Sequence, residues 1–327
     1  MTRILAAISW SIISAVTYPS SNVSIISQHT ANDRFTVAIM REDSVLIPFA
    51  EYRDGIWSAP WPKPEGYSEN TNELAELPKP WFERENKLMT TWYFRSSEGV
   101  PMVLKAIKTM KIENHCQSNW GLLTDYPGKA LKAGEHHINI GIALDAEKDV
   151  ESPLDLTKNT VERKKIVPLI QPAFDKTEGI TLAKIHKLGH GIHYPSDAQR
   201  RKKKLHITKL YRNKSPINGL YIYQIEARKE YKKDLYSYDP NCNTLSIFQG
   251  WVLKNRMGEL TLIDSGTVVT DCDMKVSDII KLLGIMRVGG RVFIVTEDHG
   301  YEDEGYSIHE LKGSRIKRLL KVNGGGC

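Results

Sequence analysis

The chain has 327 residues, of which 41% are hydrophobic and 26% are charged, and its formal net charge at pH 7 is +6. This is the composition of an ordinary globular protein, so it excludes disorder of the whole chain. The length excludes a minimal module and is enough to bury a sizeable core, in one large β-domain or in two smaller ones.

The N-terminus has the layout of a secretory signal peptide. Arg3 precedes an apolar run from Ile4 to Val16, and small or turn-forming residues follow. This order is typical of exported proteins, and the run is too short to span a bilayer as a stable helix. We therefore expect residues 1–20 to be a signal peptide and the mature protein to be secreted or periplasmic, without a transmembrane segment. A buried first strand is the alternative.

Short apolar or alternating runs, separated by turn signals, fill most of the remaining chain. They comprise residues 35–40, 45–52, 88–94, 100–107, 136–144, 179–185, 220–227, 245–253 and 258–264. Asp-Gly, Glu-Gly and Gly-Gly pairs supply the positive backbone angles that tight hairpins need. The pattern predicts an all-β fold of antiparallel strands, in which residues 275–286 are the best candidate for a helix.

The end of the chain is predicted to form four consecutive strands, at 284–288, 291–297, 305–311 and 315–322. Gly289-Gly290 forms a two-residue hairpin corner between the first two. A meander of this size has the form of one propeller blade, so we favour a β-propeller-like array of meanders. Tandem β-sandwiches would produce similar spacing and are the alternative.

A composition shift marks residues 146–179 as a boundary. This stretch is polar and charged, contains Pro153, and holds a lone apolar patch between prolines at 166–174. Such shifts are typical of linkers and insertions. We expect the segment to separate an N-terminal β-rich region, residues 21–145, from a C-terminal β-rich region, residues 180–327.

Four cysteines, Cys116, Cys242, Cys272 and Cys327, would allow three full pairings in an oxidising compartment. None has the CxxC spacing of zinc ribbons or thioredoxin-like proteins. Cys242 and Cys272 flank an expected hairpin, so we predict a disulfide between them. Buried free thiols are the alternative.

One short motif points to catalysis. Asp264 begins the sequence Asp-Ser-Gly-Thr after an apolar strand. The motif resembles the D-[ST]-G-[ST] signature of pepsin-like and retroviral aspartic proteases, in which two carboxylates share a proton and activate a water. The chain has no second motif of this kind, so a protease of this type would need a homodimer to supply the other carboxylate, as in the retroviral enzymes. A strand that ends in an ordinary turn is the favoured interpretation.

A second candidate site is the stretch that contains His186, His190 and His193. Three histidines on one loop could wrap a zinc ion. Two glycines and Pro195 argue against a helix, and no glutamate lies between the histidines as in the H-E-x-x-H metalloproteases. A polar, partly exposed loop is the favoured interpretation.

The third candidate is the acidic stretch around His299, which we expect to be a loop between two strands. Asp298, Glu302 and Asp303 offer the oxygen ligands that calcium prefers. Their spacing departs from the EF-hand pattern, so a calcium site would need ligands from other loops, such as Asp271. A solvated acidic turn is the favoured interpretation.

The densest cationic run is "RRKKK", residues 200–204. No recognised nucleic-acid motif or aromatic stacking pattern accompanies it, so we expect no nucleic acid as a partner. Contact with an anionic envelope surface fits an exported protein better. A protein or a carbohydrate is also open as a partner, the latter because the chain has seven tryptophans.

These signals concern export and β-architecture rather than chemistry. The chain has no G-x-S-x-G elbow, no Walker A loop and no dinucleotide-binding glycine motif. We therefore expect an exported β-rich binding or envelope-associated protein without catalysis. The alternative is an aspartic-type or metal-dependent hydrolase that uses Asp264 or the cluster of His186, His190 and His193.

Overall fold

The structure, a computed structural model, describes residues 33–61, 65–66, 91–96, 99–114, 117–129, 137–187, 195–214, 217, 219–231, 243–270, 279–300 and 303–326. Strands account for 63% of these residues and helices for 15%, and the sheets are antiparallel. The expected predominance of antiparallel β-structure is confirmed. Three sheets and a layer of helices make up the described part.

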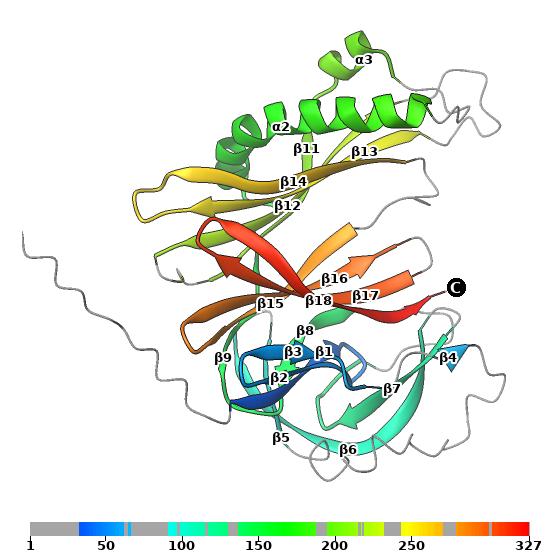
Figure 1. Cartoon of the computed structure of the whole chain (residues 1–327), viewed down its shortest axis with the longest axis vertical. Helices are drawn as coiled ribbons and strands as arrows, with labels where there is room; N and C mark the ends of the chain where they lie inside the picture. Colours follow the sequence, from blue (N-terminus) through cyan, green and yellow to red (C-terminus); the bar gives the residue numbers. More distant parts are fainter. Residues whose placement is uncertain are drawn as a thin grey trace, which may run out of the picture.

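Six strands near the N-terminus form a closed barrel (Figure 1). They are β1 (Arg34–Arg41), β2 (Val45–Arg53), β5 (Thr91–Arg95), β6 (Pro101–Asn114), β7 (Gln117–Thr124) and β8 (Asn139–Leu144). The pairing follows the order β1, β2, β7, β6, β5, β8, and β8 returns to β1. Two short strands, β3 (Ile56–Ser58) and β4 (Glu65–Gly66), pair with β2 and β7. One apolar cluster, which includes Trp92, draws on all six barrel strands and fills the interior.

The last four strands form a meander, as the sequence predicts. They are β15 (Ile279–Val288), β16 (Arg291–His299), β17 (Asp303–Lys312) and β18 (Arg315–Gly326). Gly289 and Gly290 form the first corner with φ angles of +55° and +78°, the positive values that a two-residue hairpin requires. The short strand β9 (Asp149–Glu151) pairs with β15, and the five strands together are called the central sheet.

The outer sheet lies on one side of the central sheet and carries the helices on its other face. Its strands are β10 (Leu154–Asp155), β11 (His206–Arg212), β12 (Tyr221–Tyr231), β13 (Thr244–Lys254) and β14 (Leu260–Thr270). Helix α2 (Thr160–Lys187) packs on it through Phe174, whose ring centroid lies 6.0 Å from that of Phe248. Helix α3 (Asp197–Lys202) follows at the outside (Figure 1).

The layers therefore stack in the order helices, outer sheet, central sheet and barrel (Figure 1). Phe49 of the barrel packs against Tyr306 of the central sheet, with ring centroids 5.4 Å apart. Strands β1 and β2 thus bury one face inside the barrel and the other against the central sheet. This double burial explains why both are continuous apolar runs instead of alternating ones.

Helix α2 lies in the segment that we expected to be a linker or insertion, and it includes residues 179–185, which we expected to be a strand. The expected strand at 179–185 was wrong, because these residues continue a helix whose start was hidden by two prolines, Pro168 and Pro172. Proline in a helix interior removes a backbone hydrogen bond and usually ends the helix. Here both prolines are exposed, and buried residues recur at every fourth position, at Ile166, Ile170, Phe174, Glu178 and Leu182.

The predicted helix at 275–286 is also wrong, because residues 279–288 form strand β15, which lies between β16 and β9 in the central sheet. This strand is apolar on both faces: Leu282 packs toward the outer sheet and Leu283 toward the barrel. A β-bulge between Leu282 and Gly284 breaks the alternation. Apolar residues at irregular short spacing then resemble a helical stripe.

A propeller-like arrangement is not shown. Propeller blades are four-stranded sheets set around a central channel, whereas these sheets stack in layers beside a closed barrel. The expected division into domains stays a prediction. The segment 146–179 supplies β9 to the central sheet and β10 to the outer one, in addition to most of α2.

Candidate functional site

Asp264 lies inside strand β14, and not in a turn at its end. The strand runs on to Thr270, and Asp264 is exposed opposite Trp251, where a β-bulge shifts the register. Charges and bulges on edge strands hinder pairing with other chains. Among the described residues, no hydrogen bond or ion pair joins Asp264 to a second carboxylate. The position fits protection of a sheet edge better than proton sharing.

Of the histidine cluster, the structure places only His186. It is exposed in the last turn of α2. His190 and His193 lie outside the described residues, so the zinc site stays a prediction.

The predicted disulfide also falls outside the described residues, since Cys242 and Cys272 are not among them. The neighbouring strands are described, however. The register of β13 with β14 ends at Leu245 opposite Thr270. The predicted bridge between Cys242 and Cys272 stays a prediction.

The acidic stretch is largely strand, which corrects the expectation of a solvated turn. Glu297 and Asp298 belong to β16, Glu304 belongs to β17, and all three side chains are buried. Asp303 is exposed at the start of β17, and Glu302 lies outside the described residues. Neighbours on a strand point to opposite faces. Glu297 therefore faces the barrel, whereas Asp298 faces the outer sheet.

Glu304 joins the central sheet to the barrel. One oxygen of Glu304 accepts a hydrogen bond from the amide of Asn139 at 2.7 Å, and the other lies 3.4 Å from Nε2 of His137. Tyr306 donates its hydroxyl to Glu304 as well. Burial, followed by the charge of Glu304, raises the pKa of Tyr306 well above its usual value. The tyrosine therefore stays protonated and acts as a donor.

Glu297 is paired with two cationic or titratable neighbours. Its Oε2 lies 3.4 Å from Nζ of Lys281, and its Oε1 contacts the imidazole of His299. Burial opposes the charged form of His299. The hydrogen bond and charge of Glu297, together with the charge of Glu304, nevertheless raise the pKa of His299 above its ordinary value. The carboxylate of Glu297 is therefore paired with Lys281 and His299.

On the other face, Asp298 accepts a hydrogen bond from Ser307 at 2.7 Å. His309 lies nearby, with its Nε2 3.0 Å from the hydroxyl of Thr296. Burial, followed by the positive charge of Arg318, lowers the pKa of His309 to about 4. This histidine is therefore neutral at physiological pH.

Within the described ranges, no group of three or more histidine, cysteine, aspartate or glutamate side chains could hold a metal ion. The three candidate sites are also not brought together. Asp264 lies on the edge of the outer sheet, His186 at the end of α2, and Asp298 between the two sheets. The described residues of the three candidate sites therefore lie on separate elements and do not form one site.

A different site emerges at helix α2, whose acidic side chains contact the outer sheet. Glu178 is fully buried and accepts a hydrogen bond from the hydroxyl of Tyr231 at 2.7 Å. Asp175 accepts one at 2.7 Å from Nζ of Lys229, which is itself only 1% exposed. Glu162 accepts one from the hydroxyl of Tyr223 at 3.2 Å.

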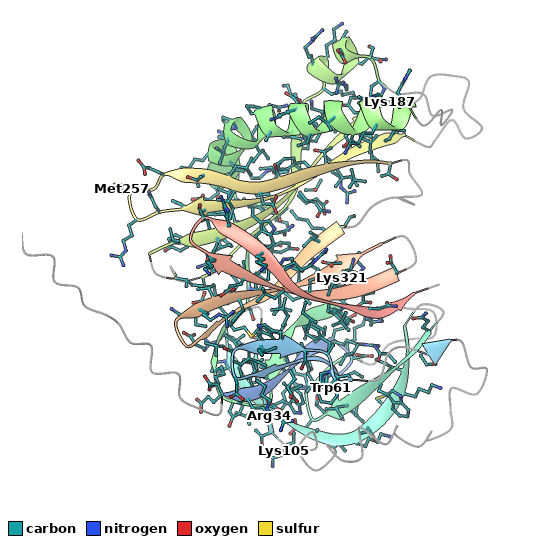
Figure 2. The ribbon with its side chains drawn as sticks, in the orientation of Figure 1. Arg34, Trp61, Lys105, Lys187, Met257 and Lys321 are labelled. Carbon is teal, nitrogen blue, oxygen red and sulfur yellow. The ribbon has the colours of Figure 1, made fainter. Side chains whose placement is uncertain are left out.

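Most of the exposed charged side chains of α2, α3 and the residues just after α3 are cationic. We call this surface the basic helical face; its exposed cations are Lys164, Lys165, Lys176, Lys184, Lys187, Arg201, Lys202, Lys203 and Lys204. Figure 2 shows Lys187 at the end of α2, in the outermost layer. The exposed carboxylates of these helices, Asp175 and Asp197, are both paired: Asp197 lies 2.6 Å from Arg200. The face therefore carries a net positive charge.

Sequence reasoning found only the α3 part of this face, through the run "RRKKK". The α2 part was missed because its prolines obscured the helix. The available signal was the four-residue spacing of Ile166, Ile170 and Phe174, which defines the buried side of a helix. The flanking Lys164 and Lys176 then fall on the opposite, exposed side.

Comparisons with protein-family models, curated proteins and solved structures gave no match. Neither α2 nor α3, the helices of the described part, is both long and apolar enough to cross a membrane.

Proposed function

We propose that the protein is an exported β-rich binding protein that attaches through the basic helical face to an anionic surface of the cell envelope. The observation that supports it is the segregation of charge across α2. Its acidic side chains contact the outer sheet, and its lysines point away from it. The helix lies on a sheet, so it presents these lysines as a fixed array.

The strength of such an attachment follows from the number of cations. Each lysine or arginine near an anionic membrane surface contributes about 1 kcal/mol, and the attraction falls off within a Debye length. That length is about 8 Å at physiological ionic strength. Several cations on one face therefore suffice for reversible binding that weakens steeply as salt increases.

The placement of the other candidate groups supports binding rather than catalysis. Glu297 is paired with Lys281 within the central sheet, and Glu304 is bonded to Asn139 of the barrel. Asp264 is exposed on an edge strand. Neither arrangement has the shared proton that aspartic proteolysis needs.

Sedimentation with vesicles tests the proposal. The vesicles contain equal parts of phosphatidylglycerol and phosphatidylcholine, or phosphatidylcholine alone. The test variant replaces Arg201, Lys202, Lys203 and Lys204 by glutamine. The control variant replaces the same number of exposed cations elsewhere, namely Lys105, Lys108, Lys312 and Arg315, so both variants have the same net charge. Lys105 lies at the barrel end of the molecule (Figure 2).

We expect the wild type and the control to bind the anionic vesicles at low salt and to release them as salt increases. The test variant should lose most of this binding. Equal loss in the two variants, or equal binding to neutral vesicles, would contradict the proposal.

Export is tested separately, by N-terminal sequencing of the protein from its natural host. We expect a mature chain that begins after the apolar run Ile4 to Val16. An intact Met1 in the cytosolic fraction would contradict export.

A further inference from the structure

An open hollow of about 390 Å³ lies along the N-terminal half of α2. The described residues that line it are Thr160, Arg163, Lys164, Val167 and Pro168. Its volume lies within the range of about 300 to 1,000 Å³ that is typical of small-molecule sites. The hollow therefore has room for a ligand, and its lining combines two cations with apolar side chains.

The two cations are not neutralised by nearby carboxylates. Within the described part of the chain, neither Arg163 nor Lys164 forms an ion pair. Glu162 is the nearest acid along the helix, and it is engaged with the outer sheet. Its carboxylate accepts a hydrogen bond from Tyr223 at 3.2 Å and lies 3.7 Å from Nζ of Lys254. An anion in the hollow would thus meet positive charge without a competing carboxylate.

The backbone at the start of the helix is not the source of this attraction. The side-chain oxygen of Asn159 accepts hydrogen bonds from the backbone amides of Val161 and Glu162, both at 3.1 Å. These amides are therefore already capped. An anion would be held by the side chains of Arg163 and Lys164, and arginine can bind a phosphate through two parallel hydrogen bonds.

Val167 and Pro168 give the hollow an apolar part beside its cations. Val161, on the same helix, is 60% exposed. A free phosphate or a sugar phosphate would leave this apolar surface unused, whereas a ligand with an anionic head and an apolar tail would bury it.

We propose that this hollow binds the phosphate and the first methylene groups of an anionic phospholipid. The inference rests on the proposed attachment to an anionic envelope surface. It adds that one hollow on the basic helical face binds an individual lipid of that envelope. Arg163 and Lys164 hold the phosphate, and Val167 and Pro168 contact the start of the acyl chains.

Titration with dihexanoyl-phosphatidylglycerol below its critical micelle concentration tests this site on the full-length protein. Binding is followed by the amide NMR shifts or by calorimetry. The test variant is Arg163→Gln with Lys164→Gln. The matched control is Arg315→Gln with Lys312→Gln, which removes the same two charges from the exposed turn between β17 and β18, away from the helices. Thermal unfolding of both variants shows whether they remain folded.

We expect saturable binding to the wild type and to the control, and a loss of about tenfold or more in the test variant. Glycerol phosphate and dihexanoyl-phosphatidylcholine should bind more weakly than the anionic lipid. The site would be overturned by equal loss in both variants, by glycerol phosphate binding as tightly as the lipid, or by the absence of saturable binding. If one of these outcomes is found and the protein still binds anionic vesicles, the proposed attachment through the basic helical face stands. Only the proposed lipid site is then refuted.

Discussion

Nζ of Lys229 lies 2.7 Å from Oδ1 of Asp175 and 3.1 Å from the backbone oxygen of Arg200. One buried lysine of the outer sheet thus holds both helices. The ring of Phe174 lies beneath the same ammonium group, 4.7 Å from ring centroid to Nζ. Because this contact directs a carboxylate of α2 toward the sheet, the outer side of the helix is left with its lysines.

Replacement of Lys229 by methionine should destabilise the fold. The change leaves the buried carboxylate of Glu178, whose Oε2 lies 3.9 Å from Nζ, with less compensation. Removal of one partner from a buried ion pair costs about 3 to 5 kcal/mol. Urea unfolding of Lys229→Met measures the effect.

Asp175→Asn is the control for this prediction. The Asp175 side chain is 52% exposed, so its pairing with Lys229 is partly screened by water. We expect a loss of no more than about 1 kcal/mol. A variant Lys229→Met as stable as the wild type would contradict the structural role of this lysine.

His309 should make the protein less stable in acid. Its pKa is about 4 in the folded state because burial disfavours the imidazolium, and about 6.5 is usual in an unfolded chain. Between these values the unfolded state binds more protons, so stability falls as the pH decreases through this window. The difference of about 2.5 units corresponds to at most roughly 3 kcal/mol.

The measurement is the free energy of unfolding of the wild type and of His309→Gln, from neutral pH to about pH 4. The wild type should lose more stability than the variant over this range. Parallel curves for the two proteins would show that His309 does not titrate as described.

His299 should act in the opposite direction. Burial lowers its pKa, but the hydrogen bond and charge of Glu297 outweigh this and raise it. A raised pKa in the folded state stabilises the fold below the unfolded value of about 6.5. That stabilisation disappears as the pH rises through the folded pKa.

We therefore expect the melting temperature of the wild type to exceed that of His299→Gln by more at about pH 5.5 than at about pH 8.5. Because 42% of the side chain is exposed, the effect should be small. A difference that grows with pH would contradict the assigned pairing.

The fold could be predicted where apolar residues in the sequence mark the buried positions of a regular strand. The corner at Gly289 and Gly290 and the four final strands were predicted because tight turns and apolar runs are local signals. Closure of the barrel was not predictable, because the pairing of β1 with β8 joins residues far apart in the chain. The burial of Glu297 could not be predicted from the sequence either, because its partner Lys281 comes from a different strand.

The candidate site was predictable only in part, for a related reason. A run of cations such as residues 200–204 is visible in the sequence. The lysines of α2 are visible too, but their common orientation depends on a helix that contains Pro168 and Pro172. The acids of that helix are balanced by Lys229 and Tyr231, which lie on the sheet beneath it.

Asp264→Asn tests the hydrolase alternative. Since Asp264 is exposed on an edge strand, we expect the substitution to change stability by no more than about 0.5 kcal/mol. Casein hydrolysis between acid and neutral pH should be absent from both wild type and variant. Activity in the wild type that disappears in Asp264→Asn would identify the carboxylate as catalytic and refute a purely binding role.

The most direct measurement of the central proposal is the reactivity of each lysine toward an amine-acetylating reagent, with and without vesicles that contain phosphatidylglycerol. Mass spectrometry gives the extent of modification at each position. We predict that the anionic vesicles protect Lys176, Lys187, Lys202 and Lys203 on the basic helical face and leave Lys105 and Lys108 of the barrel unprotected. Protection of the barrel lysines instead, or equal reactivity at all of these positions with and without vesicles, would contradict attachment through the helices.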